Sequence, residues 1–314
     1  MPVVDGDAAH GHRDAAARGD SRNRRGHRGL TVKAREKVEA RHVRAELLPE
    51  QSAELLKTLH LLTRDGDLNA DARRKLKQVN HLVGLVQPAL DDVFARYPAP
   101  LVVDVGSGNS YLGFVLYELF FAKRDAGELK NVESRADLVK RSRERASQLA
   151  YARMTFDEAS IEASVLPERV HVLTALHACD TATDDAIVQA VRHKADHVAL
   201  VPCCQAEVAQ QLKDARRAVK PEMSALFAHA WHRREFGSHL TNVIRALLLE
   251  SFGYQVTVTE LAGWEHSLKN ELILGRRVHK ESREARQRLE QLLLATGVRP
   301  KAVRVLWGEE QACA

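Results

Sequence analysis

The chain has 314 residues, of which 45% are hydrophobic and 28% are charged. This apolar content supports a sizeable core, and no stretch approaches the roughly eighteen uninterrupted apolar residues of a membrane span, which excludes a transmembrane protein. Four cysteines are too few for a disulfide scaffold in a chain of this length. No apolar signal segment opens the sequence, so we expect a cytoplasmic protein without a membrane partner.

The formal net charge of +5 is concentrated near the N-terminus. Residues 1–45 hold eleven Lys/Arg and six Asp/Glu, so the remaining residues carry equal numbers of both signs. Residues 1–30 are rich in Gly and Arg and nearly free of large apolar side chains, and we expect a disordered basic tail there. Such a tail can contact the phosphates of RNA or simply keep the protein in solution, and the sequence leaves both open.

Residues 31–98 have helical periodicity and are expected to form an N-terminal helical cap. Asn69 is the expected N-cap of the second helix, and Pro88 is expected to kink or split that helix. The apolar residues at helical spacing are Leu55, Leu56, Leu59 and Leu62 in the first helix, and Leu76, Val79, Leu82, Val83 and Val86 in the second.

Residues 99–278 alternate short apolar runs with helical stretches, which is typical of βαβ units and a parallel sheet. No helical stretch separates the last two runs, so these should pair as an antiparallel hairpin. The expected fold is α/β, a Rossmann-like seven-stranded, mostly parallel sheet with a C-terminal antiparallel hairpin. Residues 279–314 are expected to form a C-terminal helical extension. The expected strands are 101–105, 129–133, 153–157, 170–176, 196–202, 254–261 and 270–276.

The segment VDVGSGNS follows the first expected strand. Gly106 and Gly108 allow a backbone to approach a ligand without a Cβ in the way, and a helix starting near Ser110 would present free N–H groups. The third glycine of a dinucleotide motif is replaced by Tyr111, and the Lys-Ser/Thr pair of a phosphate-binding loop is absent. The pattern therefore predicts a site for a nucleoside without a pyrophosphate.

Glu133 ends the second expected strand, 25 residues after Gly108. A carboxylate at this place can accept hydrogen bonds from both hydroxyl groups of a ribose. A solvated loop residue is the alternative, and the glycine motif at this spacing favours the ribose.

The motifs VDVGSG and NVES, together with the closing hairpin, resemble class I S-adenosylmethionine-dependent methyltransferases over roughly residues 70–277. The resemblance implies S-adenosylmethionine as the cofactor. Its methionine and ribose parts would lie along the glycine loop, and Glu133 would bind the ribose hydroxyls. Its adenine would lie beside the loop after the third strand. The implied cofactor-binding residues are Asp104, Gly106, Ser107, Gly108, Asn109, Glu133, Ser134, Ser160, Ile161 and His177.

Two further segments, LTALHACDTATDDAI and VALVPCCQAEVAQQL, resemble a narrower methyltransferase-domain family. It includes the eukaryotic tRNA 2′-O-methyltransferase and proteins with a glutathione-transferase-like C-terminal domain. The resemblance and the Arg-rich tail favour RNA, either tRNA or rRNA, as acceptor and partner, and no obligate protein partner is indicated. A protein or small-molecule acceptor, or a non-catalytic cofactor- or RNA-binding module, stays open.

The candidate catalytic residues lie in the loops after the fourth and fifth strands. They are His177, Cys179, Asp180, Cys203 and Cys204. In one interpretation the cysteines shape the pocket while Asp180 or His177 orients or deprotonates the acceptor. The alternatives are a cysteine nucleophile that adds to a pyrimidine, a metal site and plain core packing. Vicinal cysteines fit tetrahedral zinc poorly, so no metal is expected.

Residues 231–254 begin with a cluster of basic side chains. It is either a rim for a phosphate-bearing acceptor or an exposed helix start. Its members are His232, Arg233, Arg234 and His239.

Overall fold

The computed structural model describes residues 48, 51–62, 70–176, 178–203, 205–261 and 271–308. The expected basic tail, the expected N-cap Asn69 and the candidates His177 and Cys204 lie outside these residues. No helix in the described ranges is both long and apolar enough to cross a membrane.

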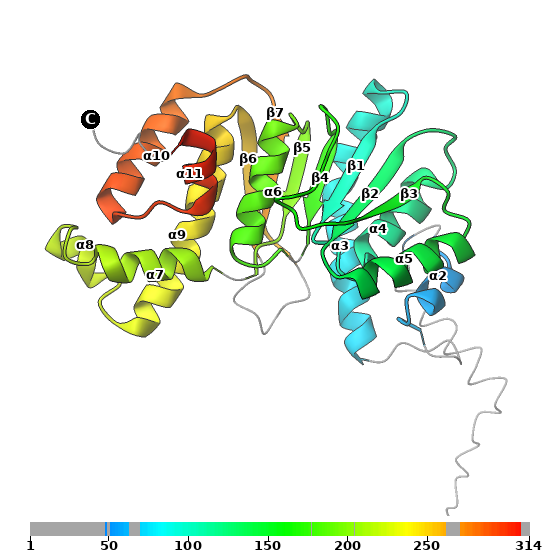
Figure 1. Cartoon of the computed structure of the whole chain (residues 1–314), viewed down its shortest axis with the longest axis horizontal. Helices are drawn as coiled ribbons and strands as arrows, with labels where there is room; N and C mark the ends of the chain where they lie inside the picture. The colour runs from blue at the N-terminus through cyan, green and yellow to red at the C-terminus, as the bar shows by residue number, and fades with distance from the viewer. Residues whose placement is uncertain are drawn as a thin grey trace, which may run out of the picture.

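The centre of the molecule is a seven-stranded sheet (Figure 1). Its strands are β1 (Leu101–Val105), β2 (Glu128–Glu133), β3 (Met154–Glu158), β4 (Val172–Ala175), β5 (His197–Leu200), β6 (Tyr254–Glu260) and β7 (Glu271–Arg277). Their order is β3-β2-β1-β4-β5-β7-β6, with β7 antiparallel to both of its neighbours and all other pairs parallel. The expected fold is confirmed, with strand ends shifted by at most two residues.

The strand order predicts where on the sheet a ligand would bind. From β1 the chain builds outward through β2 and β3 and then crosses to β4 on the other side of β1. Ligands of such sheets bind beyond the carboxyl ends of the strands at this switch point. The loops after β1, β2, β4 and β5 therefore meet at one edge of the sheet.

Helices cover both faces of the sheet and form two cores. Side chains alternate along β1, so Val102 lies in one core while Val103 and Val105 lie in the other. The first core includes α2 (Ala53–Thr58), α3 (Ala70–Arg96), α4 (Tyr111–Leu116), the π-helix η1 (Tyr117–Phe121) and α5 (Ala136–Gln148). The second includes α6 (Thr181–Arg192), α7 (Ala206–Ala215), α8 (Pro221–Ala225), α9 (Ala230–Ser251), α10 (Arg283–Thr296) and α11 (Lys301–Trp307).

Of the kink or split expected at Pro88, the split does not occur. The helix α3 runs through Pro88 without interruption for 27 residues. Val86, Leu90 and Val93 on either side of the proline are almost fully buried. Burial of each such side chain contributes about 1.5–3 kcal/mol, which offsets the roughly 3 kcal/mol that a proline costs inside a helix.

The helix α2 is fixed to the domain by its first turn. Ser52 caps the helix by accepting a hydrogen bond from the N–H of Leu55, and its own N–H donates to the Glu118 carboxylate at 3.0 Å. Leu55, Leu56 and Leu59 are fully buried in the core that α3 and α4 share. The expected cap helices therefore pack directly on the α/β fold.

Candidate active site

The loop between β1 and α4 holds three residues in left-handed backbone conformations. Gly106 has φ +64°, Gly108 has φ +57°, and Ser110, buried at the start of α4, has φ +56°. The N–H of Ser107 donates to the Val132 carbonyl at 3.0 Å, which ties this loop to β2. A Cβ added at Gly108 would meet no atom within 4 Å. The glycines thus allow a turn that other residues adopt only with strain, beside open space that a ligand can fill.

Glu133, at the end of β2, is bonded to the same loop. Its Oε2 accepts from the N–H of Gly108 at 2.8 Å, and its Oε1 accepts from the N–H of Arg135 at 3.0 Å and the Ser134 hydroxyl at 3.3 Å. A carboxylate has about four acceptor positions, so it can still accept a bond from a ligand hydroxyl. The side chain is only 11% exposed, which keeps its position fixed.

Asp104 is buried within β1, just before the glycine loop. Its Oδ1 accepts a hydrogen bond from the hydroxyl of Thr174 at 2.8 Å. Burial raises the pKa of Asp104 to about 7, and the charge of Glu133 adds to the increase while the bond from Thr174 opposes it. A cationic group placed beside such an acid would favour its ionised form and lower its pKa.

The loop after β3 lies against the glycine loop. Ile161 is buried, and its Cδ1 would be 3.5 Å from a Cβ added at Gly106. The hydroxyl of Ser160 accepts from the N–H of Ala163 at 3.2 Å, so it serves a local turn. Asn109, between the glycines and α4, is half-buried.

The loops after β4 and β5 bring two cysteines together. The Sγ atoms of Cys179 and Cys203 are 2.7 Å apart, as expected for neighbouring parallel strands. Cys179 is exposed and Cys203 half-buried, and neither forms a disulfide. Across the ranges described, no group of three or more His, Cys, Asp or Glu could hold a metal ion. The alternative metal site includes His177 and Cys204, so it extends beyond those ranges.

Asp180 joins the same two loops. Its Oδ1 accepts from the N–H groups of Ala206 and Glu207, at 2.9 and 3.2 Å, and so caps the start of α7. Its backbone has φ +48°, a strained value for a residue other than glycine. Its carbonyl accepts from Nη2 of Arg245 at 2.7 Å. Asp180 therefore holds the two loops together. This structural role is independent of any part it takes in orienting or deprotonating an acceptor.

Sequence reasoning missed Arg245. It is 1% exposed, and its Nη2 lies 2.6 Å from Oδ2 of Asp184, which is equally buried. This pair holds α6 against α9 directly under the Asp180 turn. The signal in the sequence is an arginine inside the apolar run VIRALLL, because a charge on a buried helix face needs a buried partner.

A polar pocket of about 200 Å³ lies beside the loop after β5. Ser238 donates to Oε1 of Gln205 at 2.7 Å, and Asn242 donates to Oε2 of Glu271 at 3.0 Å. His239 also lines the pocket. Among the four residues of the expected basic rim, His239 is the one that lines this pocket.

The other expected rim residues point elsewhere. Arg233 donates to the Phe227 carbonyl at 3.4 Å, and the Arg234 guanidinium lies 4.2 Å from the centre of the Trp231 ring. His232 is exposed at the start of α9. These three side chains belong to the outer surface of α9.

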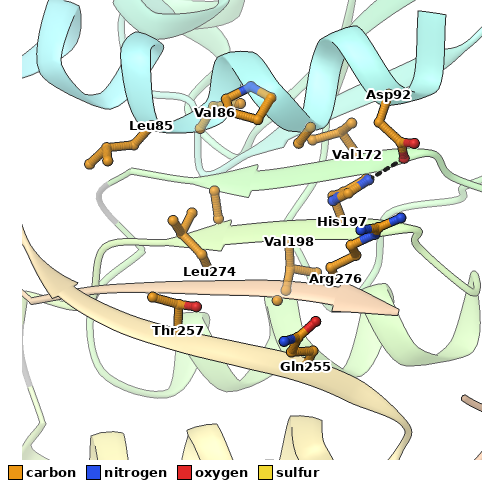
Figure 2. A pocket seen from close by; sticks show the side chains of 14 residues that line it. Leu85, Val86, Asp92, Val172, His197, Val198, Gln255, Thr257, Leu274 and Arg276 are labelled. Carbon is orange, nitrogen blue, oxygen red and sulfur yellow. Dashed lines mark hydrogen bonds and ion pairs between the residues drawn. The ribbon is translucent and has the colours of Figure 1, made fainter. Parts of the chain in front are cut away.

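A larger pocket of about 340 Å³ lies between α3 and the strands β4 to β7 (Figure 2). Apolar side chains such as Leu85 and Leu274 line it, and Nε2 of His197 lies 2.7 Å from Oδ2 of Asp92. His197 is the first residue of β5, so the pocket reaches the amino end of the sheet. It is separate from the glycine loop.

Comparison with known families identifies part of the chain. A family model described as a methyltransferase domain matches residues 74–211, which include the glycine loop, Glu133, both cysteines and Asp180. Residues 74–211 are thus similar to a methyltransferase domain. This match indicates S-adenosylmethionine as the cofactor. The open space at Gly108, the acid at the end of β2 and the buried Asp104 are compatible with that molecule.

Curated relatives extend beyond the methyltransferase domain. The chain is 25% identical over 232 residues to the human glutathione S-transferase C-terminal domain-containing protein, which covers 68% of this chain and 35% of that protein. Its homologue in Drosophila melanogaster is 26% identical over 269 residues, 77% of this chain and 40% of the relative. The chain thus spans about a third to two-fifths of the length of these relatives.

Solved structures with a similar chain trace include the SAH-bound methyltransferase PaMTH1 from Podospora anserina. It is 11% identical, covers 79% of this chain and 97% of its own, and has a TM-score of 0.44. The SAH-bound magnesium protoporphyrin IX methyltransferase from Synechocystis PCC 6803 is 13% identical over 72% of this chain and 93% of its own, with a TM-score of 0.41.

Proposed function

We propose that this protein transfers the methyl group of S-adenosylmethionine to RNA. The similarity to a methyltransferase domain supports the donor, and a cationic surface on α7 to α9 supports the acceptor. That cationic surface is the observation that carries the choice of RNA.

The donor side is assigned to residues at the tips of β1 and β2. Glu133 would accept bonds from the ribose hydroxyls, and Asp104 would face the amino group of the methionine part. The backbone at Gly106 and Gly108 would lie along the cofactor, with Ile161 against the adenine. When bound, the cofactor supplies a methyl group on a positively charged sulfur. The protein then has to hold an acceptor atom in line with that methyl, which contributes about 7–11 kcal/mol.

The cationic surface is formed by α7, α8 and the start of α9, at one end of the molecule (Figure 1). We call it the α7–α9 ridge, and its exposed cationic and aromatic members are Lys213, Arg216, Arg217, Lys220, His229, Trp231, His232 and Arg234. Two exposed acids, Asp214 and Glu222, lie on the same helices, so the cations are in excess. Within the described residues, Arg216, Arg217 and Lys220 form no ion pair.

The ridge combines cations with an exposed aromatic ring. Trp231 is 60% exposed, and the guanidinium of Arg234 stacks over it. A base can stack on such a ring while neighbouring cations contact phosphates, which is how single-stranded RNA is bound without sequence preference. Since α7 begins at Ala206, whose N–H bonds Asp180, the ridge is anchored to the acceptor edge.

Methyl transfer from labelled cofactor to total RNA of the source cell tests the proposal. The wild type should label RNA. The double variant Arg216→Glu/Arg217→Glu should bind RNA more weakly, with a salt dependence lowered by about 1–2 in the slope of log affinity against log salt. Lys280→Glu/Arg283→Glu makes the same charge change just after β7, at the amino end of the parallel strands, and should leave RNA binding unchanged.

Three experimental outcomes would contradict this proposal. Label in a protein or a small-molecule fraction would change the acceptor. Cofactor binding without transfer to any cell fraction would indicate a non-catalytic module. Equal loss of RNA binding in both charge-reversal variants would mean that the ridge is not the contact surface.

A further inference from the structure

We propose that Cys179 and Cys203 form a reversible intramolecular disulfide that cross-links the loops after β4 and β5. This modification site goes beyond methyl transfer, and its formation requires no acceptor.

The geometry already brings the two thiols together. Ala175 and Leu200 are register partners at the ends of β4 and β5, and each cysteine lies three or four residues further along. With 2.7 Å between the two Sγ atoms, an approach of about 0.7 Å would reach the length of an S–S bond. No rearrangement of the sheet is needed.

Contacts outside the cysteine pair hold both loops in place. Asp180, next to Cys179, is bonded to the N–H groups of Ala206 and Glu207, shortly after Cys203. The buried Arg245 donates to the carbonyl of Asp180. Because these bonds do not involve sulfur, they position the thiols in both the reduced and the oxidised protein.

The two thiols differ in access to solvent. Cys179 is exposed and can meet a dissolved oxidant, whereas Cys203 is half-buried beside it. An accessible thiol next to a second one is the arrangement of reversible redox pairs, in which the second thiol resolves the first oxidation product. We assign Cys179 as the attacking thiol and Cys203 as the resolving thiol.

The chemistry balances with a peroxide as oxidant. The Cys179 thiolate attacks one peroxide oxygen, the O–O bond breaks, and a sulfenic acid and one water form. The Cys203 thiolate then attacks that sulfur, the S–S bond forms, and the hydroxyl leaves as a second water. Two thiols lose two electrons and two protons in total, and two equivalents of a small thiol reductant reverse the step by exchange.

The disulfide would act mainly on the acceptor side. It would fix the Cys179 loop and remove its free thiol, while Glu133 ends β2 and Gly108 lies in the loop after β1. We therefore expect oxidation to change methyl transfer more than it changes cofactor affinity, because Glu133 and Gly108 follow other strands.

The test uses the full chain, reduced and then treated with hydrogen peroxide, with free thiols blocked before mass analysis. We expect the mass loss of two hydrogen atoms and a linked peptide pair containing Cys179 and Cys203, both reversed by dithiothreitol. Cys204→Ser is the matched control and should keep the link. Cys179→Ser and Cys203→Ser should each lose it without losing cofactor binding.

Several results would overturn the proposal. These are a link that survives in Cys203→Ser, oxidation of Cys179 to a sulfinic acid without a link, and the absence of any link in the wild type. Because the readout is a covalent bond, failure of RNA methylation would leave this result interpretable.

Discussion

The carboxylate of Glu133 accepts a hydrogen bond from the N–H of Gly108 at 2.8 Å, across 25 residues of sequence. One side chain therefore closes the glycine loop and faces the space beside it. Removing the side chain would loosen the loop and remove a ligand contact at the same time. The proposed cofactor site is thus a coupled unit of the first two strand ends.

Gly108→Ala should weaken cofactor binding and lower stability. The residue has φ +57°, a conformation that costs an alanine roughly 1 kcal/mol, and the added methyl group would enter the open space beside the loop. Calorimetry and thermal unfolding measure the two effects. Gly84→Ala, in the exposed middle of α3 with nothing within 4 Å, is the control and should raise stability by about 0.5–1 kcal/mol. Equal cofactor affinity in both variants would contradict the role of Gly108.

Asp104→Asn should stabilise the protein at high pH. The pKa of Asp104 is raised from 3.8 to about 7 in the folded state. Between these values the folded chain binds one more proton than the unfolded chain, so stability falls as pH rises through this window. The variant should have a higher free energy of unfolding at pH 8, by a few kcal/mol, and a smaller gain at pH 5. Denaturant unfolding at both pH values checks this, and an equal effect at both would contradict it.

The same substitution should weaken cofactor binding. An ammonium group of the cofactor would favour the ionised carboxylate, so wild-type affinity should increase between pH 6 and pH 7.5 as Asp104 ionises. In Asp104→Asn this increase should be absent. A pH series of calorimetric titrations measures it, and a parallel increase in the variant would assign the titration to another group.

Asp180 can be tested for a chemical role apart from its capping role. Asparagine also caps helices well, so Asp180→Asn should keep most of the stability, whereas Asp180→Ala should lose about 0.5–2 kcal/mol. If the carboxylate acts on the acceptor, both variants should lose transfer. Full activity in Asp180→Asn would limit the residue to positioning the loops.

Arg245→Met should be strongly destabilising, by about 3–5 kcal/mol, because it leaves Asp184 charged and unpaired in the core. Arg288→Met breaks the half-exposed ion pair to Glu250 and should cost less than about 1 kcal/mol. Chemical denaturation compares the two. Similar losses in the free energy of unfolding would mean that the buried ion pair contributes no more to stability than the half-exposed one.

Local patterns predicted the sheet, and they also predicted that the residues proposed for the cofactor side lie together. Gly106, Gly108 and Glu133 lie at strand ends that apolar runs mark in the sequence, and their meeting follows from parallel pairing. The helix is not split at Pro88, because its continuity depends on burial along α3, which a local rule does not contain. The bonds from Asp180 to α7 and from Arg245 to the Asp180 turn span 26 and 65 residues, so no short pattern encodes them.

Calorimetric titration of S-adenosylmethionine into the wild type and Glu133→Ala tests the central claim most directly. Loss of a hydrogen-bonded charged group should weaken binding by about 1.5–3 kcal/mol, or roughly 10- to 150-fold. Glu144→Ala, which removes an exposed acid on the following helix, should bind as the wild type does. Equal affinity in all three proteins would show that the cofactor does not lie across the ends of β1 and β2.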